Sequence, residues 1–187
     1  MVPEIYLVDK IRQLQQNNDN IIIAIDGRCA SGKTTLANKL SMKLDLNILH
    51  MDDFFLRPEQ RTKEREFEPG GNVDRERFLE EVLKPLKSSK SFSYRPYDCH
   101  IGGLADEIKI QPKSISIVEG SYSCHPALWD YYDLHIFMTV SKEEQINRLQ
   151  TRNADCLTTF QQKWIPYEEN YFAVYNLMES CEIVFTT

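Results

Sequence analysis

The strongest constraint on the fold comes from residues 21–40, IIIAIDGRCASGKTTLANKL. They begin with a β-branched apolar run that does not alternate with polar residues. Such a run is typical of a strand buried on both faces of a parallel sheet. Leu36, Leu40 and Leu44 then recur at fours, which predicts a helix over residues 34–44. The stretch therefore predicts a buried strand, a short loop with two glycines, and a helix.

The loop between this strand and helix predicts a phosphate-binding site. Residues 27–34, GRCASGKT, fit the pattern G-x-x-x-x-G-K-[ST], and we call them the phosphate loop. Its glycines let successive backbone N–H groups point at an anion, and the helix adds its positive end. Lys33 is expected to reach the β- and γ-phosphates, and the Thr34 hydroxyl is expected to bind Mg²⁺. We expect ATP or GTP to be bound by Gly27, Arg28, Cys29, Ala30, Ser31, Gly32, Lys33, Thr34 and Thr35.

The rest of the chain alternates predicted strands and helices. Further strands are predicted at 46–51, 114–120, 133–140 and 181–185, and further helices at 3–16, at 78–86, from 142 onward and at 161–179. Alternation of this kind implies a parallel sheet with right-handed crossovers. We therefore expect an α/β P-loop NTPase fold, a three-layer sandwich with a central parallel sheet of about five strands. We expect a small lid or hairpin in addition, and one domain over residues 1–187.

Three local features refine this outline. Pro85 is expected to end or kink the helix at 78–86, and Ser141 with Glu144 fits a capping box that starts a helix at Lys142. Residues 57–77 are charged, contain Pro-Gly-Gly and are expected to form a mobile loop. The alternating residues 91–98 are a candidate for an antiparallel hairpin with residues 106–110.

Composition narrows the classes of partner. The net charge of −6 argues against a general nucleic-acid binder, and no apolar run approaches the length of a membrane span. The five cysteines include no CxxC pair, and without a signal peptide they predict free thiols in the cytoplasm. Each of the Cys-His pairs, at 99–100 and 124–125, joins adjacent residues, which differs from zinc-ligand spacing. A homo-oligomer is left open.

Carboxylates follow two of the predicted strands. Asp52 and Asp53 come after residues 46–51, and Glu119 comes after the apolar part of 114–120. Because ligands bind beyond the carboxyl ends of parallel strands, Asp52 and Glu119 are expected to converge on the phosphate loop. Asp52 is expected to orient an attacking hydroxyl, and Asp52, Glu119 and Thr34 are the candidate Mg²⁺ residues. The alternative is that these carboxylates are helix N-caps.

Two further groups allow two interpretations each. Arg148 and Arg152 are four residues apart, so they share a helix face and could close over the transferring phosphate; otherwise they form a solvated face. The helical spacing of Trp164, Tyr167, Tyr171 and Tyr175 favours core packing over base stacking.

Cys29 stands inside the phosphate loop. An adduct on its thiol would fill the space of the anion, so alkylation is expected to inhibit and ATP to protect. If the thiol points away, it is inert.

The chain resembles the uridine kinase family of P-loop nucleoside kinases, with its phosphoribulokinase and nicotinamide riboside kinase relatives. The resemblance rests on IDGRCASGKTTLA, HMDDFF, GGNVDRERF, PYD, IVEGSYS, YDLHIFMTVS and RLQTRN. It implies a catalytic role for Asp52, ribose binding by Asp74, a place near the base for Tyr97, a place near Mg²⁺ for Glu119, and lid roles for Arg148 and Arg152. His100 stands closer to the tyrosine than the base-reading histidine of uridine kinases, and no arginine-glycine-rich lid follows Arg152.

The resemblance implies a kinase that uses ATP to phosphorylate a small molecule. Its acceptor would be a hydroxyl, foremost the 5′-hydroxyl of a nucleoside. The two departures weigh against pyrimidine specificity, and DDFF fits nicotinamide riboside kinases equally well. A kinase of nicotinamide riboside or of a sugar, and a nucleotide-binding regulator with little turnover, are the alternatives.

Overall fold

The computed structural model describes residues 4–187. Its strands are β1 (Ile21–Gly27), β2 (Asn47–His50), β3 (Phe92–Tyr94), β4 (Tyr97–Asp98), β5 (Gly103–Leu104), β6 (Ile108–Ile110), β7 (Ile115–Glu119), β8 (Leu134–Thr139) and β9 (Ile183–Thr186). Its α-helices are α1 (Glu4–Gln15), α2 (Lys33–Ser41), α3 (Lys63–Phe67), α4 (Arg75–Phe78), α5 (Lys84–Lys87), α6 (Lys142–Asn153), α7 (Leu157–Thr159), α8 (Ile165–Val174) and α9 (Leu177–Ser180). Short 3₁₀ turns occupy Met51–Phe54, Pro58–Gln60, Trp129–Tyr131 and Ala154–Cys156.

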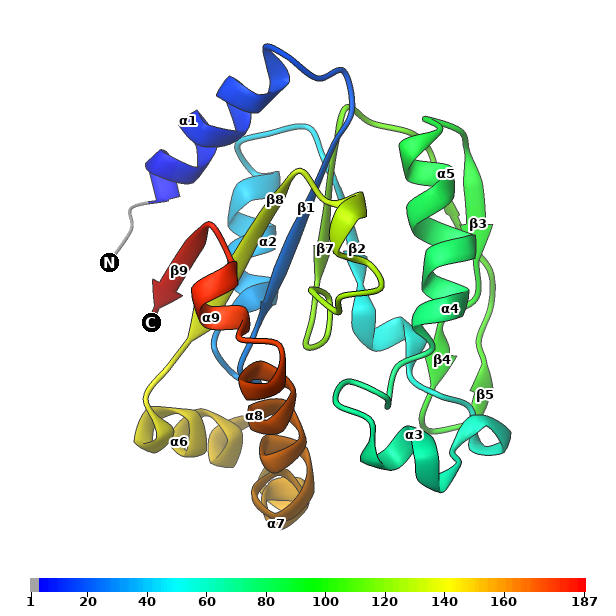
Figure 1. The fold of residues 1–187 in the computed structure, drawn as a ribbon, viewed down its shortest axis with the longest axis vertical. Helices are drawn as coiled ribbons and strands as arrows, with labels where there is room; N and C mark the ends of the chain where they lie inside the picture. Colours follow the sequence, from blue (N-terminus) through cyan, green and yellow to red (C-terminus); the bar gives the residue numbers. More distant parts are fainter. Residues whose placement is uncertain (1–3) are drawn as a thin grey trace.

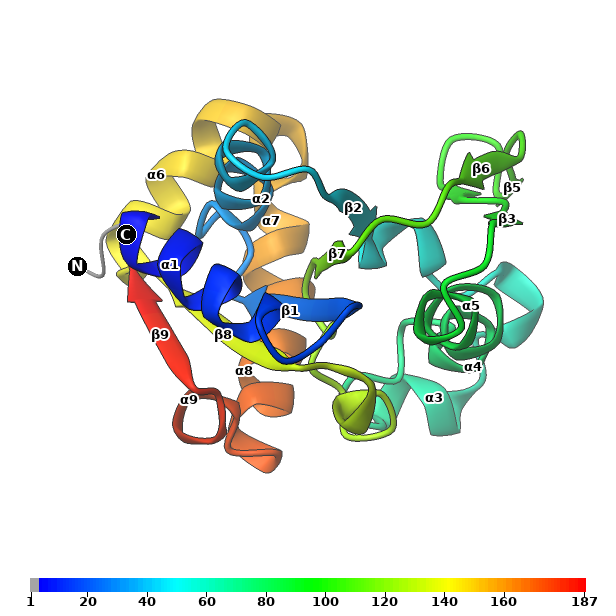
Figure 2. The same cartoon turned by 90° about the horizontal axis from the view of Figure 1, so that it is seen from above.

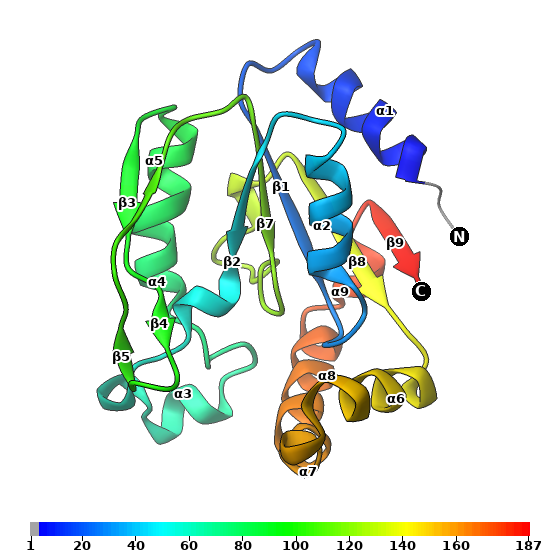
Figure 3. The ribbon, with the colours of Figure 1, turned by 180° about the vertical axis from the view of Figure 1, so that it is seen from behind.

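A five-stranded parallel sheet forms the centre of the molecule (Figures 1 and 3). Its order is β2-β7-β1-β8-β9, so the five predicted strands and their parallel pairing are confirmed. Every residue of β1 is buried. The carboxyl end of this central strand leads directly into the phosphate loop, which therefore lies where a ligand of an open parallel sheet binds.

Helices cover both faces of the sheet, which confirms the three-layer arrangement. Ile21, Ile23 and Ile25 of β1 pack with α1 and α2 on one face. Ile22 and Ala24 pack on the other face with α8, α9 and the helix that begins with α4. Figure 2 shows α2 and α8 on opposite sides of the strands. Burial on both faces explains why the strand sequence is apolar without alternation.

The helix predicted at 78–86 does not end at Pro85. Its helical path runs from α4 through a π-helical stretch, Leu79–Leu83, into α5, which ends at Lys87. The i→i+5 bonds of a π-turn shift the backbone donors, which accommodates a proline that lacks an N–H just after the turn.

The helix predicted at 161–179 is also divided. A π-stretch, Phe160–Trp164, precedes α8, and Asn176 in the left-handed region (φ 50°) separates α8 from α9.

Residues 57–77 contain helical structure, so the expectation of a loop over this whole segment is wrong. They contain a 3₁₀ turn, α3 and the start of α4, and the Thr62 side chain caps α3 by accepting from Arg65 N. The Arg65 guanidinium donates to Gly71 O and Val73 O and pairs with Glu76, which ties the segment together. Arg65 and Arg75 thus pair with carboxylates of the same segment.

Two small antiparallel sheets stand beside this segment. β3 pairs with β6, as predicted from residues 91–98 and 106–110, and β4 pairs with β5. The first helix is confirmed within the described residues, while α2 ends at Ser41, three residues earlier than predicted. In residues 4–187, no helix combines the length and the apolar character needed to cross a bilayer.

Candidate active site

The phosphate loop has a backbone that only glycine can adopt at two points. Gly27 has φ 131°, and a Cβ there would lie 2.0 Å from Met138 O of the neighbouring strand β8. Gly32 has φ 92° and is the N-cap of α2, whose first turn no side chain caps. The N–H groups of an uncapped first turn are available to an anion, and the helix dipole favours negative charge there.

A cavity of about 580 Å³ opens at this loop. Six of the nine expected nucleotide residues line it, together with Asp52, Glu119 and Arg152: Cys29, Ala30, Gly32, Lys33, Thr34 and Thr35. Gly27, Arg28, Ser31, Arg148, Asp74 and Tyr97 do not line it. The expected convergence of Asp52 and Glu119 on the phosphate loop is therefore observed.

The Lys33 ammonium is bound to its own loop. It is 8% exposed and donates to Gly27 O at 2.7 Å, to Arg28 O at 3.0 Å and to Ser121 Oγ at 3.4 Å. Carbonyl and hydroxyl oxygens are uncharged partners, and a phosphate would bind the same ammonium more strongly. Within residues 4–187, no carboxylate contacts this ammonium directly, so its charge is available to a phosphate.

Glu119 joins the loop to β2. Its Oε1 accepts a hydrogen bond from Thr34 Oγ1 at 3.0 Å and contacts His50 Nδ1 at 2.6 Å. This hydrogen bond raises the pKa of His50. Sequence reasoning missed His50, because its place beside Glu119 follows from the register of β2 on β7.

The oxygen ligands available near Thr34 fit Mg²⁺. Thr34 supplies a hydroxyl, and Glu119 and Asp52 supply carboxylates facing the same cavity. Residues 4–187 contain no cluster of three or more His, Cys, Asp or Glu side chains that could enclose a metal. Mg²⁺ in kinases is held by one or two protein oxygens together with phosphates and water, so a sparse oxygen set suits it.

Of the two neighbouring aspartates, only Asp52 faces the cavity. Both lie in the 3₁₀ turn Met51–Phe54 that follows β2, but the Asp53 carboxylate accepts a hydrogen bond from Tyr94 OH at 2.9 Å. The Asp52 side chain is exposed at the cavity surface, although protein atoms crowd around its carboxylate and partly desolvate it. This desolvation raises the pKa of Asp52, Lys33 opposes it, and Glu119 reinforces it.

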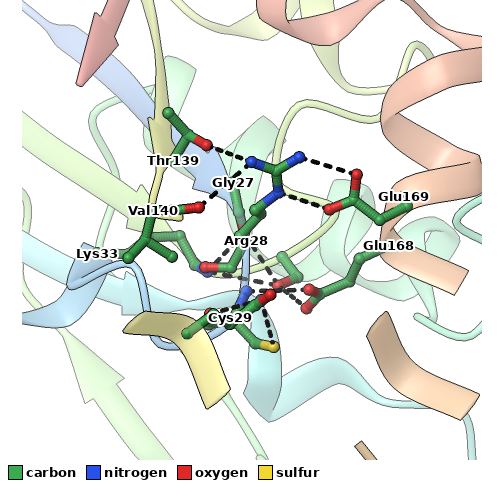
Figure 4. A network of polar contacts seen from close by, with 10 residues as sticks. Gly27, Arg28, Cys29, Lys33, Thr139, Val140, Glu168 and Glu169 are labelled. Carbon is green, nitrogen blue, oxygen red and sulfur yellow. Dashed lines mark hydrogen bonds and ion pairs between the residues drawn. The ribbon is translucent and has the colours of Figure 1, made fainter. Parts of the chain in front are cut away.

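Two glutamates of α8 contact the phosphate loop from the side (Figure 4). Glu168 Oε2 accepts from Cys29 N at 2.9 Å, and its Oε1 accepts from Ser121 Oγ at 2.7 Å. Glu169 pairs with Arg28 through two bonds of 2.6 and 3.0 Å, and Arg28 also donates to Thr139 Oγ1. Sequence reasoning missed both glutamates. Arg28 and Cys29 therefore fix the loop to α8, and of the two only Cys29 also lines the cavity.

Cys29 is a poor nucleophile in this setting. Burial raises the pKa of its thiol to about 12, and the nearby Glu168 carboxylate adds to the effect. Gln145 Nε2 donates to both its carbonyl oxygen and its sulfur. Because the thiolate is the reactive form, this environment disfavours the alkylation expected from the sequence.

The carboxylate of Asp26, the residue directly before the phosphate loop, is fully buried. Asp26 Oδ1 accepts from the N–H groups of Gly27 and Tyr122, and Oδ2 accepts from Cys124 N and Tyr171 OH. Burial raises the pKa of Asp26 to about 6, although these bonds oppose the shift. Asp26 thus joins the phosphate loop to the segment after β7. Sequence reasoning did not predict this role, because the partners Tyr122, Cys124 and Tyr171 lie far away along the chain.

The two arginines of α6 separate. Arg152 lines the cavity, and its Nε donates to Asn153 Oδ1. Arg148 instead pairs with Glu144 and donates to Ala30 O and Thr187 Oγ1. The two arginines therefore do not act as the predicted pair: Arg152 faces the cavity, and Arg148 contacts the phosphate loop through Ala30 O.

The acceptor residues implied by the resemblance lie behind the cavity wall. Asp74 is 4% exposed and caps α4, accepting from Arg77 N and from Gln60 Nε2. Tyr97 is 7% exposed, and its OH accepts from Arg61 Nη2. The structure therefore presents Arg61 to the cavity where the resemblance implied the tyrosine ring.

The aromatic residues near the C-terminus divide between core and cavity. Tyr171 is fully buried and Tyr175 packs against the core, as expected. Trp164 and Tyr167 line the cavity, so core packing is wrong for these two. Trp164 ends the π-stretch and Tyr167 lies in the first turn of α8.

Comparison with known proteins gives the family of the chain. Residues 22–155 match the family model described as Phosphoribulokinase / Uridine kinase family. The chain is 31% identical over 144 residues to nicotinamide riboside kinase 2 of Homo sapiens, an alignment that covers 71% of this chain and 58% of that protein. The chain thus spans less than two thirds of the length of this curated relative.

Two solved structures share the fold. A structure described as a possible uridine kinase from Bacillus stearothermophilus has a TM-score of 0.69 at 20% identity, covering 96% of this chain and 99% of that one. D-glycerate 3-kinase from Cryptococcus neoformans has a TM-score of 0.65 at 15% identity, covering 89% and 86%. At these identities the likeness concerns the fold alone.

Proposed function

Because the chain belongs to the phosphoribulokinase/uridine kinase family, we propose that it is a kinase that transfers the γ-phosphate of ATP to a hydroxyl of a small molecule. The cavity that joins the phosphate loop to Asp52 and Glu119 supports this most strongly. A nucleotide switch needs the loop and the metal residues but has no use for an acid facing an acceptor space. Asp52 is such an acid.

The roles follow from the positions of the side chains. The triphosphate lies on the uncapped N–H groups of the loop, with the Lys33 ammonium turned from Gly27 O to phosphate oxygen. Thr34 and Glu119 would hold Mg²⁺, with Asp52 facing the same cavity; when bound, the ion would supply positive charge against the phosphates. Arg152 provides a further cation at the cavity wall, and Arg148 keeps Ala30 in place from outside.

Asp52 orients the acceptor hydroxyl and takes its proton. Desolvation raises the pKa of Asp52, and a carboxylate with a raised pKa is a stronger base. Asp74 and Tyr97 support the acceptor space indirectly, through Gln60 and Arg61. ATP is the expected donor, with GTP as the alternative, and residues 1–187 act as one kinase domain.

The acceptor we expect is the 5′-hydroxyl of a nucleoside. Identity with human nicotinamide riboside kinase 2 keeps nicotinamide riboside as the first alternative, and a sugar as the second. The test is a screen, over nucleosides, nicotinamide riboside and sugars, for acceptor-dependent release of ADP from ATP or of GDP from GTP in the presence of Mg²⁺. Slow ADP release that no acceptor accelerates would favour a nucleotide-binding regulator instead.

Lys33→Ala is the matched control for this screen. Lys33 contacts only loop oxygens and Ser121, so its loss should leave the fold intact by circular dichroism while turnover disappears. A folded Lys33→Ala protein with near wild-type turnover would contradict the phosphate role.

A further inference from the structure

Arg61 stands in the wall of the cavity without an acidic partner. It follows the 3₁₀ turn Pro58–Gln60 and lines the cavity with Asp52 and Thr62. Its Nε donates to Leu56 O at 3.0 Å, and its Nη2 donates to Tyr97 OH at 2.8 Å. Neither acceptor is charged. Within residues 4–187, no carboxylate oxygen lies within 4.0 Å of this guanidinium.

The other arginines of segment 57–77 all have acidic partners. The closest pairs are Arg57–Glu59 at 3.5 Å, Arg65–Glu76 at 2.8 Å, Arg75–Glu68 at 2.7 Å and Arg77–Glu81 at 3.1 Å. Nearby Arg95 donates to two carbonyl oxygens, and it does not line the cavity. Arg65 also lines the cavity, but its charge is paired with Glu76. Among the arginines of segment 57–77, all of which the structure describes, Arg61 is therefore the one that faces the cavity without a carboxylate partner.

Arg61 is also held in position before any ligand arrives. Tyr97 is almost fully buried, and its hydroxyl fixes one edge of the guanidinium, whose Cζ lies 5.7 Å from the centre of the tyrosine ring. Leu56 O fixes the Nε edge. The Nη1 donors then remain for a ligand, in the planar arrangement that matches a carboxylate or phosphate.

We propose that Arg61 binds an anionic group of the acceptor, a carboxylate or a phosphate, while the hydroxyl to be phosphorylated lies at Asp52. This inference rests on the proposed kinase function of the cavity. It predicts that the enzyme prefers hydroxyl compounds that carry such a group over their neutral counterparts. Among nucleosides, those with a carboxylate on the base would be preferred.

Matched acceptor pairs test the preference. Suitable pairs are nicotinamide riboside with nicotinic acid riboside, uridine with orotidine, glycerol with glycerate, and ribose with ribose 5-phosphate. For each compound we would measure acceptor-dependent ADP release, and the thermal shift in the presence of Mg²⁺ and a non-hydrolysable ATP analogue. The expected result is that at least one anionic member exceeds its neutral partner in kcat/KM by about tenfold or more, as a charge-assisted bond would give.

Arg61→Gln should abolish that difference by raising the KM for the anionic acceptor about tenfold to hundredfold, with little change in the KM for ATP. Arg61→Lys keeps the charge but loses the planar fork, so it should be intermediate. Lys63→Gln is the control, because Lys63 is an exposed cation of the same segment that does not line the cavity. It should behave as wild type.

The inference is overturned if neutral and anionic members are used equally well, or if Arg61→Gln leaves the preference unchanged. It is also overturned if no anionic compound produces ADP release or a thermal shift, or if Arg61→Gln raises mainly the KM for ATP, which would assign Arg61 to the nucleotide. Phosphorylation of neutral acceptors by wild type and Arg61→Gln alike would leave the kinase function standing. Unchanged turnover in Lys33→Ala would instead defeat the kinase function itself.

Discussion

Glu168 Oε2 accepts a hydrogen bond of 2.9 Å from the backbone N–H of Cys29, which places a buried carboxylate of α8 against the phosphate loop. The other oxygen of the same side chain binds Ser121, just beyond β7. One side chain therefore connects the loop, the central sheet and a helix far along the chain. The conformation of the loop then depends on α8 as well as on its own glycines.

Glu168→Ala should weaken ATP binding. It leaves Cys29 N and Ser121 Oγ without their acceptor, and loss of a bond to a charged group costs about 1.5–3 kcal/mol, or roughly tenfold to hundredfold in affinity. Glu168→Gln keeps one acceptor oxygen and should lose less. Titration calorimetry with a non-hydrolysable ATP analogue measures both. Glu143→Gln, an exposed change on α6, is the control. Tighter ATP binding by Glu168→Ala would mean that the carboxylate only repels the triphosphate.

Asp26 should make the folded protein less stable as the pH rises from about 4 to 6. Its pKa is raised from 3.8 to about 6, so the folded protein holds a proton that the unfolded chain releases in this window. The contribution is complete below the unfolded pKa, is lost as the pH passes about 6, and is flat above that.

Asp26→Asn should remove this slope from the pH profile of the free energy of unfolding. It should also lower stability by about 1–3 kcal/mol, because an amide NH₂ would face donors such as Cys124 N and Tyr171 OH. Chemical denaturation at several pH values measures both effects. An Asp26→Asn protein with the wild-type slope would assign the pH dependence to another group.

Alkylation should spare Cys29 and modify Cys99 and Cys156 first. The latter two are exposed, whereas burial raises the pKa of Cys29 to about 12 and leaves almost no thiolate at neutral pH. Mass spectrometry after a timed treatment with iodoacetamide gives the order. Any inhibition should trace to Cys99, which lines the cavity, and should persist in Cys29→Ser. Preferential labelling of Cys29 would contradict the environment described for it.

Much of the fold could be predicted because its signals are local. The apolar run of β1 and the glycines after it specify a strand and a phosphate loop within a few residues. The meeting of Asp52 and Glu119 could be predicted from a general rule, since the ends of parallel strands meet at one edge of the sheet.

The partners of the loop could not be predicted in this way. Glu168 lies 139 residues from Cys29, and an acid on a helix usually indicates a solvent-exposed face. Arg61 and Arg65 belong to one charged segment and both line the cavity, and only packing decides that Arg65 pairs with Glu76 while the acceptors of Arg61 are uncharged. Arg148 and Arg152 share a helix face by spacing, yet they contact different parts of the site.

The most direct test of the account is the turnover of Asp52→Asn at low and high Mg²⁺, with ATP affinity measured separately. Asn keeps the size of the side chain but cannot take a proton. We predict unchanged ATP affinity, a loss of about 10² to 10⁴ in the rate of transfer, and no recovery with excess Mg²⁺. Recovery with excess Mg²⁺ would make Asp52 chiefly a metal ligand. Turnover above about a tenth of wild type at ordinary Mg²⁺ would contradict the claim that Asp52 activates the acceptor hydroxyl.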